Sequence, residues 1–190
     1  MKTKITAVHL ALFAMVLMIS ACAKGGPKIS NYSQEELRGE ARTALHSLYA
    51  STPETKKLRD QSVGILVFPD VFKAGFIVGG SGGNGVLFSP AEKTMGYYNI
   101  ASASVGLQAG VQGYSQVMFL MTPEALNYLD STNGWSLGVG PSIVVVDAGA
   151  AKDISTTTAR YDVFAFIHGQ RGLMGGIGVV GQKITKLRPQ

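Results

Sequence analysis

The sequence is poor in the residues that build redox and metal chemistry. Cys22 is the single cysteine among 190 residues, so an internal disulfide and a cysteine-based metal site are both excluded. Of the three histidines, His9 lies in an apolar leader, and His46 and His168 have no second ligand at close spacing. Charged residues make up 15% of the chain, and no pair of carboxylates stands out as a general acid and base. The sequence therefore predicts no metal, no cofactor and no coherent catalytic site.

The first 22 residues are typical of a bacterial lipoprotein leader. Lys2 and Lys4 precede an apolar run from Ile5 to Ile19, which is short for a spanning helix of about 20 residues. Small residues then lead to Cys22, in the pattern of a lipobox. We predict a signal peptide over 1–21, an acylated Cys22 as first mature residue, and a flexible tether over 22–32; the alternative is a transmembrane anchor with an incidental cysteine. Ala23, where Asp is associated with inner-membrane retention, favours the outer membrane facing the periplasm.

Charge sets a bound on the partners. The formal net charge is +5, and removal of Lys2 and Lys4 leaves 15 basic and 12 acidic residues, or +3. That value is too small to indicate nucleic acid, and it is compatible with an anionic membrane surface.

Three helices are expected. Ser33 and Glu36 form a capping box before an apolar stripe that runs to Leu48. Thr52 is predicted to be the N-cap of a short helix, with Pro53 at its first position, that ends near Gln61. Thr122 is predicted to cap another helix, which starts at Pro123 and ends before the Asn133-Gly134 turn.

Between and after these helices the period becomes strand-like, without alternating helices, which favours antiparallel pairing. The expected strands are Val63–Phe68, Ala74–Gly80, Gly85–Phe88, Tyr97–Leu107, Gln116–Met121, Leu137–Val146, Tyr161–His168 and Leu173–Ile184. The 24 glycines alternate with apolar residues inside these strands, which suggests bends and close backbone approach. We predict an α+β domain over 33–190: a strongly curved, mainly antiparallel sheet or partly closed barrel, with N-terminal helices and one inserted helix.

Two short motifs resemble enzyme signatures. Gly80–Gly85 matches a dinucleotide-binding pattern but precedes an apolar run and Ser89-Pro90, so a glycine-rich hairpin is the better interpretation. Gly134–Gly138 matches a nucleophile elbow at Ser136, and His168 follows in hydrolase order. Because strand and turn residues continue after Ser136 where a helix is needed, a serine hydrolase using Ser136 and His168 is a remote alternative.

The segment FPDVFKAGFIVGGSGGNGVL, from Phe68 to Leu87, closely resembles the signature of the SYLF family of lipid-binding domains, labelled actin-binding in fungal members. SVGLQAG from Ser104 and RGLMGG from Arg171 resemble two further blocks, and Met174 stands where an aromatic residue is commoner. The likeness covers roughly Leu37 to Leu187. It implies a non-enzymatic domain that binds membrane lipid, and in a periplasmic setting an anionic phospholipid rather than actin.

The candidate headgroup-binding residues are cations. Lys73 and Arg171 fall inside the matching blocks, and Lys183, Lys186 and Arg188 form a basic C-terminal strip. Lys56, Lys57 and Arg59 form a second strip. Arginine suits bidentate contact with phosphate and lysine suits a point contact. The other interpretations are solvated surface charges for the strips, and ion-pair or capping roles for Lys73 and Arg171. An envelope scaffold that contacts other envelope proteins, without a lipid ligand, is the alternative function.

Overall fold

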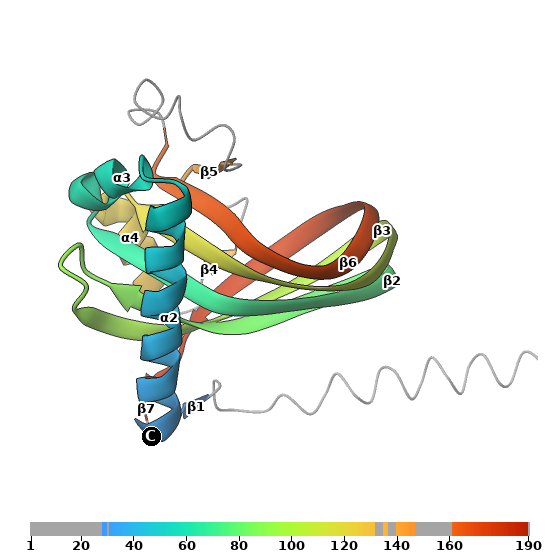
Figure 1. The fold of residues 1–190 in the computed structure, drawn as a ribbon, viewed down its shortest axis with the longest axis horizontal. Coiled ribbons are helices and arrows are strands. Elements are labelled where there is room, and N and C mark those ends of the chain that lie inside the picture. Colours follow the sequence, from blue (N-terminus) through green and yellow to red (C-terminus); the bar gives the residue numbers. More distant parts are fainter. Residues whose placement is uncertain (1–27, 30, 132–134, 137–139, 147–160, 190) are drawn as a thin grey trace, which may run out of the picture.

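The computed structural model describes residues 28–29, 31–131, 135–136, 140–146 and 161–189. Within these ranges three helices pack against a sheet whose long strands bend back on themselves (Figure 1). The α+β class, the curved sheet, the N-terminal helices and the inserted helix are confirmed. The limits at 21, 22 and 32 stay predictions, as do the signal peptide and the acylation of Cys22, which lies outside the described residues.

Three strands build the sheet. They are β2 (Gly64–Phe88), β3 (Thr94–Leu120) and β6 (Val163–Lys186), paired antiparallel in the order β2-β3-β6. At about 3.3 Å per residue, a straight 25-residue strand would extend about 80 Å, so β2 must bend to fit a small domain. Figure 1 shows all three strands running away from the helices, bending together, and returning.

The expected glycine-rich hairpin is wrong, because the structure has a bend within β2 instead. Gly79–Gly85 is not a turn but the returning half of β2, paired with residues 98–104 of β3. The hairpin turn lies instead at Ser89–Lys93, where the Ser89 amide donates to the Lys93 carbonyl at 2.8 Å and Glu92 adopts a φ of 57°. The expected pairs of short strands at Tyr97–Leu107 and Gln116–Met121, and at Tyr161–His168 and Leu173–Ile184, are likewise single strands.

Ile77 and several glycines make the bend and the close approach of its two halves. Ile77, with a φ of 64°, lies between Phe76 and Val78 where the β2–β3 register shifts. Gly110 of β3 and Gly172 of β6 have φ values of 136° and 87°. Such positive angles suit glycine because it lacks a β carbon. The expectation that glycine marks bends and close backbone approach is confirmed.

Short elements complete the sheet. β4 (Trp135–Ser136) pairs antiparallel and β5 (Ile143–Val146) pairs parallel with β6. Outside this sheet, β1 (Lys28–Ile29) pairs parallel with β7 (Arg188–Pro189). Of the expected strand Leu137–Val146, β5 is observed and 137–139 lie outside the described residues.

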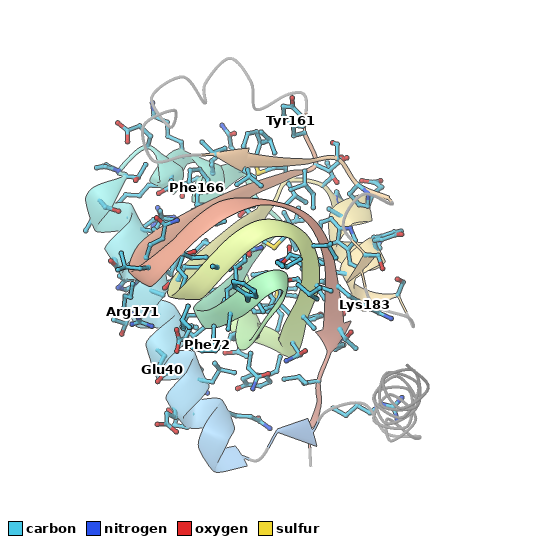
Figure 2. All side chains as sticks on the ribbon, turned by 90° about the vertical axis from the view of Figure 1, so that its right-hand side faces the viewer. Glu40, Phe72, Tyr161, Phe166, Arg171 and Lys183 are labelled. Atoms are coloured by element: carbon cyan, nitrogen blue, oxygen red, sulfur yellow. The ribbon has the colours of Figure 1, made fainter. Side chains whose placement is uncertain are left out.

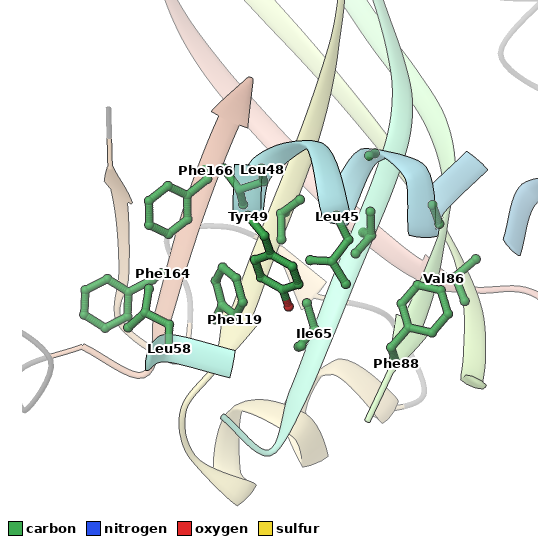
Figure 3. Close-up of a cluster of buried hydrophobic side chains, with 14 of the residues drawn as sticks. Leu45, Leu48, Tyr49, Leu58, Ile65, Val86, Phe88, Phe119, Phe164 and Phe166 are labelled. Carbon is green, nitrogen blue, oxygen red and sulfur yellow. The ribbon is translucent and has the colours of Figure 1, made fainter. Parts of the chain in front are cut away.

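Helix α2 (Asn31–Ser51) begins before the expected cap, so Ser33 lies within the helix and the capping-box prediction is wrong. Its apolar stripe is confirmed: Leu45 and Leu48 are buried against Ile65, Val86 and Phe119, as Figure 3 shows. Full burial of each leucine contributes about 1.5–3 kcal/mol relative to exposure. The stripe therefore clamps α2 across both halves of β2.

The predicted N-cap is wrong for the second helix and confirmed for the third. Helix α3 (Thr55–Gln61) begins later than expected, with Glu54 rather than Thr52 at its N-cap. Helix α4 (Pro123–Asp130) begins as expected, since the Thr122 hydroxyl accepts from the Ala125 amide at 3.2 Å. None of the helices within the described ranges is long and apolar enough to cross a membrane.

Candidate functional site

A partly open cavity of about 340 Å³ lies inside the roll of the sheet. Although most of the surface that its lining exposes to the cavity is apolar, eight of the twelve lining residues have polar side chains: Lys73, Ser81, Ser102, Gln112, Tyr114, Gln116, Gln170 and Gln182. Its apolar lining is Met118, Ile143, Val145 and Ile167. We call this space the inner cavity. The residues come from both halves of the bent strands, so the roll itself creates the site.

The pleat of the sheet explains why polar groups gather there. Gln112, Tyr114, Gln116 and Met118 alternate along β3, and successive strand residues point to opposite faces. Lys73 is the register partner of Gln112. The same face thus presents a lysine and a row of polar side chains to the cavity.

Hydrogen bonds hold part of this lining. The Gln182 amide donates to Gln116 Oε1 at 3.4 Å, and the hydroxyls of Ser81 and Ser102 are hydrogen-bonded. Burial raises the pKa of Tyr114, and a hydrogen bond with Ser81 acts in the opposite direction. Tyr114 is therefore a neutral donor and acceptor at physiological pH.

Lys73 brings the positive charge into the inner cavity. It is half-buried, and within the described ranges no carboxylate forms an ion pair with it. An anionic ligand in the cavity would therefore find a cation that no carboxylate of the described residues occupies, and a charge-assisted contact with it is stronger than a neutral hydrogen bond. A ligand that would fit this lining carries a phosphate group for Lys73 and neighbouring groups that can hydrogen-bond with serine hydroxyls and glutamine amides.

The structure places Arg171 elsewhere. Its guanidinium donates to Asp70 Oδ1 at 2.6 Å, and the two side chains are 67% and 61% exposed. At this exposure the ion pair contributes little to stability, within about 0–1 kcal/mol. Arg171 thus has the ion-pair partner that the sequence left as an alternative to a headgroup role.

The C-terminal strip does not reach the inner cavity either. Lys186 donates to Asp130 Oδ1 at 2.7 Å and lies 5.9 Å above the Tyr98 ring. Lys183 and Arg188 are exposed. In Figure 2, which looks at the bend, Arg171 and Lys183 lie on opposite sides of the roll. The five predicted cations therefore do not form one site.

A second hollow, the helix cleft, separates α2 from β6 near Arg171, lined in part by Glu40, Ser47, Asp70, Ser115 and His168. Burial lowers the pKa of His168, and its Nε2 has no hydrogen-bond partner in the described part of the chain. Ser136, in contrast, is exposed and pairs with Lys183 in the sheet. Ser136 does not line the helix cleft, so the described residues do not bring Ser136 and His168 together there. The serine beside His168 is Ser115, its register partner, whose hydroxyl donates to the Pro69 carbonyl at 2.6 Å.

The dinucleotide motif is also explained by the fold. Gly85 is followed by strand residues up to Phe88 and not by a helix. No group of three metal-ligating side chains occurs within the described residues. The polar lining at Ser81, Ser102, Gln112 and Gln116 was missed by sequence reasoning; its signal was the polar alternation along β3.

The fold and its cavity define a helix-braced, curled-sheet domain. Residues 101–188 match the family model described as Ysc84, Las17-binding protein actin regulator. Over these residues the chain is similar to the family to which the SYLF blocks pointed. At the level of the family, the domain is associated with lipid or actin binding and is generally non-enzymatic. No curated protein matches the chain.

Proposed function

We propose that this protein is a lipid-anchored envelope lipoprotein whose domain binds anionic phospholipid. Acylation of Cys22 holds the chain at a membrane, in the outer membrane on its periplasmic side. The leader residues support the anchor, because small residues precede the single cysteine. Each methylene buried in the bilayer contributes about 0.8 kcal/mol, so more than one acyl chain anchors stably.

The observation that carries the lipid proposal is Lys73 in the inner cavity without a carboxylate partner in the described residues. A lipid phosphate pairs with the Lys73 ammonium. Glycerol hydroxyls then meet the amides and hydroxyls of the cavity wall, such as Gln112 and Ser102. The apolar residues Met118 and Ile167 contact the carbon atoms of the glycerol backbone or the start of an acyl chain.

The remaining cations have a supporting role. Lys183 and Arg188 are exposed and attract an anionic surface by about 1 kcal/mol each. Arg171 and Lys186 are already paired with Asp70 and Asp130, so their contribution is smaller.

The test is sedimentation of residues 28–190 with vesicles that contain phosphatidylglycerol. We expect binding at low salt that weakens as salt rises, since surface charges are screened. Lys73→Ala should reduce binding more than Arg171→Ala. Absence of sedimentation at low salt, in a folded protein, would contradict the proposal.

The second candidate is an envelope scaffold that binds another protein. The family description, which names a binding partner and actin regulation, favours it. A periplasmic domain would meet an envelope protein rather than actin. A reproducible partner in crosslinking of the full chain, together with no response to lipid, would support this function over lipid binding.

A further inference from the structure

The outer side of the bend carries a cluster of exposed apolar side chains. They belong to all three long strands: Phe76, Ile77 and Val78 of β2, Val105 and Val111 of β3, and Leu173 of β6. Their exposed fractions lie between 49% and 89%. We call this cluster the bend surface.

These side chains form one patch because the strands are paired where they occur. Val78 is the register partner of Val105, and Val111 is the partner of both Ala74 and Leu173. Phe76 lies two positions from Ala74, on the same side of the pleat. Lys73, one position before Ala74, instead faces the inner cavity. One layer of sheet thus separates the apolar bend surface from the cavity that holds Lys73.

Acidic residues are missing from this part of the sequence. Asp and Glu are absent from 71–88, from 94–120 and from 163–186. The nearest carboxylate along β2 is Asp70, which is paired with Arg171. The patch therefore presents apolar groups with nearby cations and no carboxylate that would repel anionic headgroups.

The shape of the bend surface distinguishes between occupants. It lies on the outer side of a sharp bend, at the end of the sheet away from α2 (Figure 1). Two convex ends pressed together bury little area, whereas a stable dimer needs about 800 Å² per partner. A fluid bilayer closes around a convex apolar tip, and exposed apolar clusters of this kind mark membrane or partner contacts.

We infer that the bend surface is the part of the domain that enters the interfacial layer of an anionic bilayer. This inference rests on the proposed lipid binding and adds the orientation of the domain on the membrane. The bend enters the headgroup layer, and α2 at the other end of the strands faces away. Lys73 and the inner cavity then stand next to the phosphates, directly behind the inserted side chains.

The test compares one tryptophan at the bend with one at the opposite end of a strand. Phe76→Trp places the probe in the bend surface. Met95→Trp is the matched control, because Met95 is also exposed and apolar but lies beside the Ser89–Lys93 turn. The native Trp135 is fully buried, and its fluorescence is the background signal. The unsubstituted chain serves to measure that background.

The full chain is reconstituted into phosphatidylcholine vesicles, with or without phosphatidylglycerol, in which the acyl chains carry bromine as a quencher. We expect Phe76→Trp emission to shift to the blue and to be quenched, more strongly with phosphatidylglycerol, while Met95→Trp is not quenched. Equal quenching of both probes, or of neither, would overturn the inference. Self-association that Phe76→Ser abolishes, without quenching, would assign the bend surface to a second copy instead.

A separate measurement distinguishes a failure of the bend surface to insert from a failure of the inner cavity to bind lipid. Short-chain phosphatidylglycerol below its micelle concentration tests the inner cavity without a bilayer. Quenching at Phe76→Trp without short-chain binding supports the bend surface and contradicts the headgroup site at Lys73. Short-chain binding without quenching supports the headgroup site and contradicts insertion of the bend surface. Circular dichroism of each variant establishes that it is folded.

Discussion

Gly83 lies directly against the backbone of Asp70, thirteen residues earlier in the same strand. A β carbon at Gly83 would stand 2.5 Å from the Asp70 carbonyl oxygen and 3.2 Å from the Val71 α carbon. The two halves of β2 therefore touch through their backbones. This contact sets how tightly the sheet can roll.

Gly83→Ala should lower the free energy of unfolding by about 1–3 kcal/mol, because the added methyl group meets backbone that cannot turn away. Gly82→Ala is the control, since its β carbon would have the Ile100 carbonyl oxygen as nearest atom, at 3.6 Å. That variant should be neutral or more stable by about 0.4–1 kcal/mol. Urea unfolding of both measures the difference, and equal midpoints would contradict the close contact.

Tyr98 links the sheet to the end of α4. Its buried hydroxyl donates to Asp130 Oδ1 at 2.6 Å. Tyr98→Phe should cost about 1 kcal/mol of stability through loss of this hydrogen bond. Tyr97→Phe serves as control, because no hydrogen bond of the Tyr97 hydroxyl is found in the described part of the chain. A larger loss in the control would argue against the Tyr98 contact.

The carboxyl of Asp130 should respond to Lys186. Burial alone would raise the pKa of Asp130, but hydrogen bonds from Lys186 and Tyr98 outweigh it and hold the pKa below its ordinary 3.8. A depressed carboxyl pKa gives stability that is present above 3.8 and lost as pH falls through the folded-state value. Lys186→Gln should raise the pKa and flatten this acid-dependent loss, as measured by NMR titration of the Asp130 carboxyl. An unchanged titration would show that Lys186 is not its partner.

His168 should make the domain less stable in mild acid. Burial lowers the pKa of its imidazole below the ordinary 6.5. Between the folded-state pKa and 6.5, the imidazole is therefore protonated in the unfolded chain and neutral in the folded chain. The free energy of unfolding then falls as pH drops below about 6.5, until the folded-state pKa is reached. His168→Gln should remove this slope, and His46→Gln should retain it because His168 is intact. Denaturant curves between neutral and mildly acidic pH test this, and an unchanged slope in His168→Gln would refute it.

Lys73 should dominate affinity for a soluble anionic lipid. Lys73→Gln removes the cavity cation, and a charge-assisted hydrogen bond of about 1.5–3 kcal/mol corresponds to a loss of about tenfold or more in affinity. Lys183→Gln removes an equal charge from an exposed position on β6 and should have a small effect. Titration with short-chain phosphatidylglycerol, followed by NMR shifts, gives both constants. Equal losses would indicate nonspecific attraction.

Local signals in the sequence were sufficient for some elements. The cap at Thr122 and the apolar stripe that includes Leu45 are set by neighbours within a few residues, so they could be predicted. The continuity of β2 could not, because the bend is absorbed within the strand at Ile77 and its glycines rather than by a turn sequence. The glycines signalled curvature but not which backbone segments would meet.

The candidate site was predicted only through Lys73. Its other polar lining residues, such as Ser81 and Gln182, lie far apart in sequence and are brought to one cavity by the roll. Arg171 could not be assigned in advance, because its partner Asp70 is 101 residues away. Such long-range pairing is set by the tertiary fold.

The long β2–β3 hairpin has a consequence for how quickly the domain can form. Its closing turn at Ser89–Lys93 joins near neighbours, but the far ends, Gly64 and Leu120, are 120 − 64 = 56 residues apart. Pairing that starts at that turn has to pass through the bend before α2 has both halves of β2 to pack against. Contacts between residues so distant in sequence slow a folding reaction. Stopped-flow refolding should therefore give milliseconds to seconds, and microsecond refolding would contradict this order of assembly.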